Sequence, residues 1–145
     1  MNKLRCLILF TICLLCVGCE NPCENILPYY ITDKYISVGQ EKDLFEFAGA
    51  YIEIFNNTDL EVEQVTVNFM LYDENGKSAG IYGNQVSSSV DCGIIPHKRK
   101  TVVVSLDNVL GPNLEKSYQL DFVYISRIVY TDGTVWLNPL GLFAV

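Results

Sequence analysis

The sequence predicts an all-β domain in residues 44–145, an antiparallel β-sandwich of about seven strands, with a small β-barrel as the alternative. Apolar residues alternate with polar ones from Phe45 onward, which is typical of strands that bury one face. Clusters of Gly, Asn and Asp, which favour turns, recur at intervals of about ten residues. No stretch of this part has the apolar spacing of an amphipathic helix.

Residues 1–18 are predicted to form a secretory signal. Lys3 and Arg5 give a short positive region, and an apolar run of 11 residues follows at 7–17. A helix needs roughly 20 apolar residues to span a bilayer, so this run is too short for a stable membrane span. A basic start followed by a short apolar run is the pattern of a signal peptide.

The signal ends in Cys16-Val17-Gly18-Cys19, which resembles the lipobox of bacterial lipoproteins. Val17 and Gly18 match the family pattern, whereas Cys16 stands where Leu is usual. The resemblance implies that a diacylglyceryl group is attached to the Cys19 thiol and that residues 1–18 are then removed. The thiolate is the nucleophilic form of cysteine, and two or three acyl chains anchor a protein stably. The resemblance therefore makes Cys19 the lipidation site and the membrane a partner through that lipid.

Two alternatives stay open for the same segment. An ordinary signal peptidase would cut before Cys19 and leave its thiol free, or the segment would stay in place as an uncleaved anchor. If the lipobox holds, Glu20 follows the lipid-bearing cysteine, where some bacteria use Asp to retain a lipoprotein at the inner membrane. By that analogy the outer membrane is favoured, with the periplasmic or surface side left open.

Residues 19–43 are predicted to comprise the lipidated cysteine and a tether. Pro22, Pro28 and scattered charges indicate a spacer between membrane and domain. The apolar stretches 26–31 and 35–38 indicate that the later part lies on the domain as an extended segment.

The first strands of the body are predicted at 50–55 and 62–72. The first ends at a turn cluster, 56–59, in which Asn56-Asn57-Thr58 fits a glycosylation sequon that we interpret only as a turn. In the second strand four apolar side chains share one face, which we expect in the core: Val65, Val67, Phe69 and Leu71.

The middle of the body is less regular. Ile81-Tyr82 and residues 85–90 predict weaker strands, with Ser87, Ser88 and Ser89 at an exposed edge. Residues 100–106 predict another strand, whose Val102, Val104 and Leu106 share a face. Residues 107–113 interrupt the alternation of apolar and polar residues, and the segment is long enough for one helical turn.

The last strands are predicted at 118–131 and 135–137. Leu120, Phe122 and Tyr124 are expected to share a face, and a change of alternation further on indicates a bulge or burial on both sides. The Asp-Gly pair within 131–134 predicts a two-residue hairpin of type I′.

The number and spacing of the predicted strands resemble those of the immunoglobulin-like or fibronectin III-like sandwich domains of bacterial envelope proteins. The likeness is one of architecture and implies no activity.

Charge restricts the class of partner. The net charge is -7, and removal of residues 1–18 with Lys3 and Arg5 makes it -9. Binding to nucleic acid depends on Lys and Arg that neutralise phosphates, so we expect no nucleic acid as a partner. The same charge is unfavourable for direct contact with an anionic lipid surface and indicates a soluble body.

The mature chain holds few groups that suggest chemistry. Cys23 and Cys92 form a possible disulfide, since an envelope location permits one, or they stay separate thiols. His97, beside a basic run at 98–100, is interpreted as an exposed loop residue, and the acidic run at 73–76 as a hairpin turn rather than a calcium loop. We therefore expect no catalytic residue, no metal site and no cofactor. Nine tyrosines could include an aromatic binding patch, although Tyr also suits strands by propensity.

Three hypotheses follow for function. The first is a non-enzymatic envelope lipoprotein that binds another envelope protein or a surface polymer, or serves as a structural module. The second is an accessory lipoprotein that binds or delivers a small ligand, and the third is an enzyme. One contiguous aromatic patch would favour the first, a deep apolar pocket the second, and a buried pair of carboxylates the third.

Overall fold

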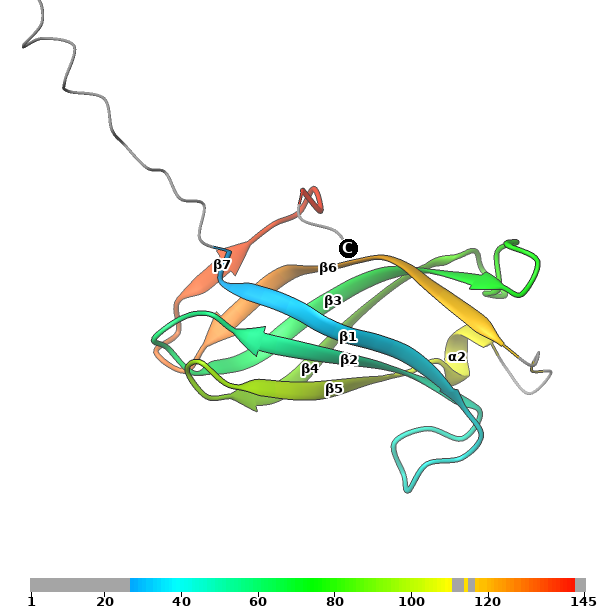
Figure 1. Cartoon of the computed structure of the whole chain (residues 1–145), viewed down its shortest axis with the longest axis horizontal. Helices are drawn as coiled ribbons and strands as arrows, with labels where there is room; N and C mark the ends of the chain where they lie inside the picture. The colour runs from blue at the N-terminus through cyan, green and yellow to red at the C-terminus, as the bar shows by residue number, and fades with distance from the viewer. Residues whose placement is uncertain (1–26, 111–113, 115–116, 143–145) are drawn as a thin grey trace, which may run out of the picture.

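The computed structural model describes residues 27–110, 114 and 117–142, which form seven strands and one helical turn (Figure 1). In chain order these are β1 (Tyr29–Val38), β2 (Ala48–Asn56), β3 (Val62–Asp73), β4 (Gln85–Ile94), β5 (Arg99–Ser105), α2 (Asp107–Leu110), β6 (Tyr118–Tyr130) and β7 (Val135–Leu137). None of the helices in this described part is long and apolar enough to cross a membrane.

The strands form two separate antiparallel sheets, one of three strands in the order β1-β2-β5 and one of four in the order β4-β3-β6-β7. The predicted all-β sandwich is therefore confirmed, and the alternative of a closed barrel is wrong. The fourth strand pairs with the third, whereas in a constant-type immunoglobulin domain it lies beside the fifth. Hairpins join β1 to β2, β3 to β4 and β6 to β7, and the other connections cross between the sheets.

The core lies between the two sheets and follows the predicted alternation. The face predicted for β3 is buried, and so are Val102 and Val104 within β5 and Leu106 just after it. On β2 the inward side chains are small or β-branched, which lets the sheets approach closely: Ala48, Ala50, Ile52 and Ile54. The serine-rich side of β4 lies on an edge strand, as predicted, with Ser87 and Ser89 exposed.

Strand β1 lies within the segment that the sequence assigns to the tether, 19–43. In the structure this segment is a strand of the three-stranded sheet, because its residues pair with β2 from Tyr29↔Asn56 to Val38↔Ala48. The Tyr29 ring is buried and packs edge-on against Trp136, with ring centroids 5.7 Å apart. Its hydroxyl accepts a hydrogen bond from the Ile125 N–H at 2.9 Å, which links β1 to β6 across the sandwich. The described β-structure thus begins at Tyr29 rather than at residue 44.

Strand β6 departs from simple alternation. The expectation that Leu120, Phe122 and Tyr124 share an inward face is wrong, because Phe122 is 54 % exposed while Val123 and Ile125 are buried. The pairing of β6 with β3 shifts register between Asn68 and Met70 and again between Thr66 and Val67. Phe122 has a φ of 48°, so a bulge at this residue turns its ring to the outside.

The turn between β6 and β7 lies where it is predicted but has another geometry. Gly133 has a φ of 84°, whereas Asp132 keeps a negative φ, and a type I′ turn needs positive values at both. Tyr130 N–H donates to the Thr134 carbonyl and Gly133 N–H to the Tyr130 carbonyl, which closes a three-residue loop. The Asp132 carboxylate accepts hydrogen bonds from both N–H and hydroxyl of Thr134, and this stabilises the observed loop.

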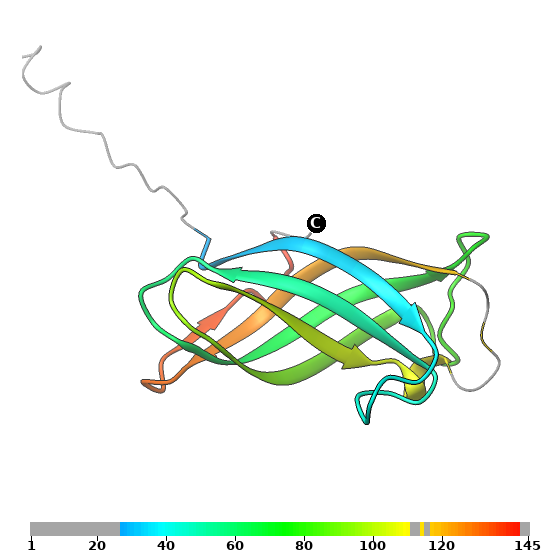
Figure 2. The ribbon, with the colours of Figure 1, turned by 60° about the horizontal axis from the view of Figure 1, so that its bottom comes forward.

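The sandwich has two distinct ends (Figures 1 and 2). At the tether end, Asn57 N–H donates to the Pro28 carbonyl and Asn56 N–H to the Lys98 carbonyl, so the start of the described chain lies beside two turns. At the far end lie the β1–β2 loop, the β3–β4 loop and α2.

Candidate functional site

The cysteines proposed for lipidation and for the disulfide are only partly described. Cys19 and Cys23 lie outside the described residues, so the lipid on Cys19 and the bridge from Cys23 stay predictions. Cys92 is 7 % exposed and faces the core, with its Sγ 3.7 Å from the Glu63 carbonyl oxygen. Burial raises the pKa of the Cys92 thiol to about 11, although the nearby Lys100 ammonium acts in the opposite direction. The thiol is therefore protonated and unreactive at neutral pH.

His97 and Lys98 lie in the β4–β5 turn at the tether end, and Arg99 and Lys100 begin β5. The His97 Nε2 lies 2.9 Å from Asp59 Oδ1, a partner distant in sequence, and both side chains are largely exposed. The Lys100 ammonium donates to the backbone carbonyl of Cys92, and Arg99 lies 3.8 Å from Glu53. These contacts attach the start of β5 to its neighbours.

The acidic run at 73–76 is a turn, as predicted. One Asp73 carboxylate oxygen accepts hydrogen bonds from the N–H groups of Asn75 and Lys77, both at 2.8 Å. Gly76 takes a φ of 75°. Within the described residues no group of three His, Cys, Asp or Glu side chains could hold a metal ion. Asp73 is also the one buried carboxylate of that part of the chain, so no buried acid pair is seen there.

The outer face of the three-stranded sheet carries aromatic side chains in cross-strand pairs. Tyr35 stacks on Tyr51 with ring centroids 4.8 Å apart, and Tyr30 stacks on Phe55 at 6.2 Å. Phe45 meets Tyr51 edge-on and lies directly over Gly49, where any Cβ would collide with the ring. Each stacked pair covers one face of its rings and stabilises the sheet, while Tyr30 and Tyr35 stay 46 % and 50 % exposed.

The far end carries exposed apolar side chains on a rigid backbone. Ile81 and Tyr82, which the sequence assigns to a weak strand, instead form the tip of a turn and are 61 % and 93 % exposed. The Ile81 N–H donates to the Val109 carbonyl of α2 at 2.9 Å, and the Gly83 N–H to the Gly80 carbonyl at 3.1 Å. A side chain on Gly80 would collide with the Gly83 carbonyl oxygen. The glycines on either side of Ile81-Tyr82 were the sequence feature that could have predicted this turn.

Helix α2 connects the loops of the far end. The Asp107 carboxylate accepts hydrogen bonds from the backbone N–H groups of Glu46 and Phe47, both at 2.8 Å, and of Ala48 at 3.3 Å. The β1–β2 loop, which carries the exposed Leu44, is thereby tied to the same helical turn as Tyr82. We call Leu44, Ile81 and Tyr82 the far-end apolar surface.

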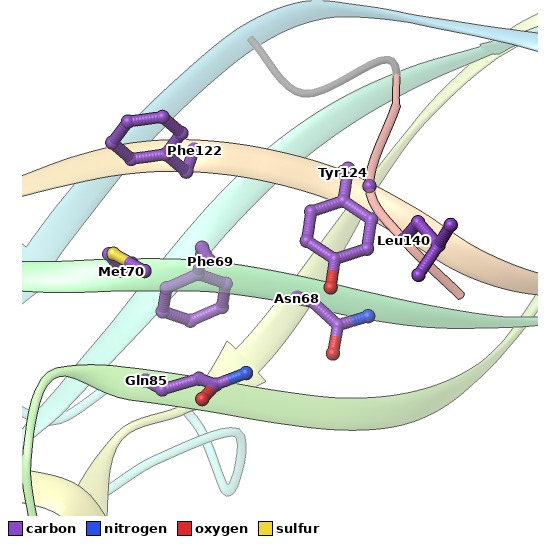
Figure 3. Close-up of a pocket in the computed structure, with 8 residues that line it drawn as sticks. Asn68, Phe69, Met70, Gln85, Phe122, Tyr124 and Leu140 are labelled. Atoms are coloured by element: carbon purple, nitrogen blue, oxygen red, sulfur yellow. The ribbon is translucent and has the colours of Figure 1, made fainter. Parts of the chain in front are cut away.

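A hollow of about 230 Å³ lies on the outer face of the four-stranded sheet (Figure 3). Strands β3, β4 and β6 and the segment after β7 contribute its lining: Asn68, Phe69, Met70, Gln85, Phe122, Tyr124, Leu140 and Gly141. Its volume lies below the roughly 300–1,000 Å³ of pockets that enclose a drug-sized ligand. The sequence does not predict this hollow, because its lining depends on the bulge in β6 and on the path of the chain after β7.

Comparison with known proteins shows a likeness of fold. An X-ray structure of a hypothetical protein from Peptoclostridium difficile 630 matches with a TM-score of 0.53 and 10% sequence identity, covering 77% of this chain and 87% of that chain. At this identity the likeness concerns the fold alone. No protein-family model matches the chain, and the search of curated proteins gave no match.

Proposed function

We propose that this protein is a lipid-anchored lipoprotein of the bacterial envelope and that its sandwich is a non-catalytic module that binds another envelope protein. The lipobox-like residues before Cys19 support the anchor, and the outer membrane remains the favoured location. The observation that carries the binding role is Tyr82, which is 93 % exposed on a turn with a defined backbone. The hollow is small for a delivered ligand, so the alternative of a small-ligand carrier has less support.

The far-end apolar surface has the properties of a binding anchor. Tyr is enriched among the residues that dominate binding energy in protein interfaces, and it loses little conformational entropy when bound. The hydrogen bond from Ile81 to α2 fixes the turn before a partner arrives, which reduces the entropic cost of association. The same loops carry exposed charges of both signs, Asp43, Glu46 and Glu74 beside Lys42 and Lys77. We therefore expect the partner to receive the Tyr82 side chain in an apolar pocket with a polar rim.

Substitution of Cys19 tests the anchor. In cells fed radiolabelled palmitate, the native chain is expected to carry the label and Cys19→Ser to lose it, because the thiol is the acceptor of the lipid. Cys6→Ser is the matched control, since it changes a cysteine outside the lipobox-like residues 16–19 and should keep the label. Equal labelling of the Cys19→Ser chain would contradict lipidation at this residue.

A photo-crosslinking amino acid at position 82 tests the binding role. In the full-length chain in its native envelope, it is expected to give a discrete adduct with one other protein, because Tyr82 is the most exposed apolar side chain described. The same amino acid at Ser89, exposed on the edge strand β4, should not give that adduct. An identical adduct from both positions, or no adduct from position 82, would count against the far end as the contact.

A further inference from the structure

The hollow on the four-stranded sheet combines two aromatic side chains that are not buried, Phe122 and Tyr124, with two side-chain amides, while Phe69 lies in the core beneath. Figure 3 shows Tyr124 and Phe122 along one side, with Asn68 and Gln85 below them and Leu140 beyond Tyr124. All eight lining residues are uncharged at neutral pH, although the chain as a whole carries a charge of -7. The chemistry of the hollow therefore differs from that of the rest of the surface.

Two structural features form this hollow. The bulge at Phe122 turns an aromatic ring outward that regular alternation would have placed inward. The chain after β7 forms the opposite wall, because Asn138 is buried and accepts a hydrogen bond from the Leu142 N–H at 3.2 Å. Gly141 lies so close to the Tyr124 ring that a Cβ would sit 3.0 Å from it. The Tyr124 ring is thus fixed from one side and open toward the hollow.

Gln85 is exposed and Asn68 is 7 % exposed at the floor of the hollow, and both amides keep unused hydrogen-bonding groups. Asn68 uses one N–H to donate to Ser126 Oγ at 2.7 Å, which leaves its carbonyl oxygen and second N–H. The Gln85 amide has no hydrogen bond to any of the residues that the structure describes, and Gln85 is exposed. An amide presents a donor and an acceptor side by side, which matches a pair of neighbouring hydroxyl groups.

We propose that this hollow is a carbohydrate subsite that takes one uncharged sugar unit of a glycan. The apolar C–H face of a sugar ring packs on Tyr124 and Phe122, while its hydroxyls bond to Asn68 and Gln85. The absence of charged groups in the lining favours a neutral unit over a uronic or sialic acid. An open hollow suits one unit of a polymer, whose remaining units extend over the sheet.

An extended peptide fits the site less well. Pairing to the edge of β6 would need free backbone N–H groups beside the hollow. The Phe122 N–H already donates to Asp121 Oδ1 at 2.9 Å, and the Ile125 N–H donates to the Tyr29 hydroxyl. The edge of β6 is therefore protected against strand addition at these two positions.

The subsite extends the proposed function by adding a glycan ligand to the protein contact at the far end. It depends on neither the lipid nor Tyr82, so its failure would leave the proposed function untouched. The test applies the full-length chain, purified in detergent, to an array of neutral and acidic glycans. Binding to glycans with terminal hexose or N-acetylhexosamine units is expected, and Tyr124→Ala should weaken it about tenfold or more.

Two further variants complete the test, one in the lining of the hollow and one on the other sheet. Gln85→Glu changes an exposed side chain without a packing role and should also lower binding, because it removes the amide donor and adds a charge. Tyr35→Ala removes a ring from the other sheet and should leave binding within about twofold of the native chain. The proposal is overturned if no neutral glycan binds at millimolar concentration, if acidic glycans are preferred, or if Tyr124→Ala and Gln85→Glu bind like the native chain.

Discussion

Replacing Asn56 by Ala is expected to lower the free energy of unfolding by about 3 kcal/mol, which corresponds to a Tm lower by roughly 10–15 °C. Asn56 is 1 % exposed, and its amide is fully used. Its Nδ2 donates to the carbonyls of Leu60 at 2.7 Å and Ile94 at 3.0 Å. Its Oδ1 accepts from the N–H and the hydroxyl of Thr58 at 3.0 and 2.7 Å.

The cost arises because truncation leaves the partners of Asn56 behind. The Ile94 carbonyl lies in the buried part of the sandwich, and an unsatisfied buried polar group costs about 1–3 kcal/mol. The side chain also connects the β2–β3 turn to β4, which belongs to the other sheet. Loss of the amide therefore weakens the tether end where the end of β2, the β2–β3 turn and the end of β4 meet.

Urea unfolding of the native chain and of two variants checks this result. Asn56→Asp keeps the acceptors for Thr58 but loses both donors, so it should be at least as destabilised as Asn56→Ala at pH 7. Asn57→Ala is the matched control, since it removes the same amide one residue further on, where the side chain is only partly buried. If Asn56→Ala and Asn57→Ala unfold at the same urea concentration, the buried network contributes little.

The core of the sandwich was predictable because it depends on local alternation. Val65, Val67, Phe69 and Leu71 are buried as expected, since each position in a strand determines its face once the strand is given. Alternation fails where the register shifts. The change of alternation after Tyr124 predicts a bulge, and the register does shift there, between Thr66 and Val67. The bulge at Phe122 is a second one, which the sequence does not indicate, and it reverses the faces of the residues after it.

Strand β1 and the turn at Ile81-Tyr82 show two other ways in which prediction from local sequence fails. β1 resembles a tether because Thr32, Asp33 and Lys34 interrupt its apolar residues, and only pairing with β2 makes it a strand. Ile81-Tyr82 resembles a strand by propensity, yet the glycines on either side and the hydrogen bond to α2 make it a turn. In both cases a contact with a segment distant in sequence overrides the local preference.

The predicted and the observed candidate sites therefore differ in kind. Cys19 is suggested by residues adjacent in sequence, so that prediction needs no knowledge of the fold. The hollow joins Asn68, Gln85, Tyr124 and Leu140 from four parts of the chain, and their convergence exists only in the folded domain. Sequence reasoning could thus propose how the protein is held at a membrane, but not which surface meets a ligand.

Replacing Asp107 by Asn is expected to lower the free energy of unfolding at pH 7 by about 2 kcal/mol. The Asp107 carboxylate accepts hydrogen bonds from three backbone N–H groups of the segment Glu46 to Ala48, and charge-assisted bonds of this kind are stronger than neutral ones. The amide that replaces the carboxylate has one acceptor oxygen and no charge, so the β1–β2 loop loses part of its attachment to α2.

The effect of Asp107→Asn should also depend on pH. Burial raises the pKa of the Asp107 carboxyl, but the hydrogen bonds from Glu46 and Phe47 outweigh it and hold this pKa below the ordinary value of 3.8. A carboxyl whose pKa is lowered by folding stabilises the native state above the ordinary pKa, and this contribution is lost as the pH falls through the lowered pKa. The difference between native chain and variant should therefore be constant from pH 7 to about pH 5 and shrink below pH 4.

Urea unfolding at pH 7, 5 and 3 measures this dependence, with Asp59→Asn as the control. Asp59 pairs with His97 at the opposite end, and its side chain is 97% exposed, so the control should unfold like the native chain at pH 7. Because the far-end apolar surface depends on α2, hydrogen exchange of the Ile81 amide should become faster in Asp107→Asn. A variant that unfolds like the native chain at pH 7 would mean that solvent replaces the carboxylate at no cost, and that α2 does not hold the far end together.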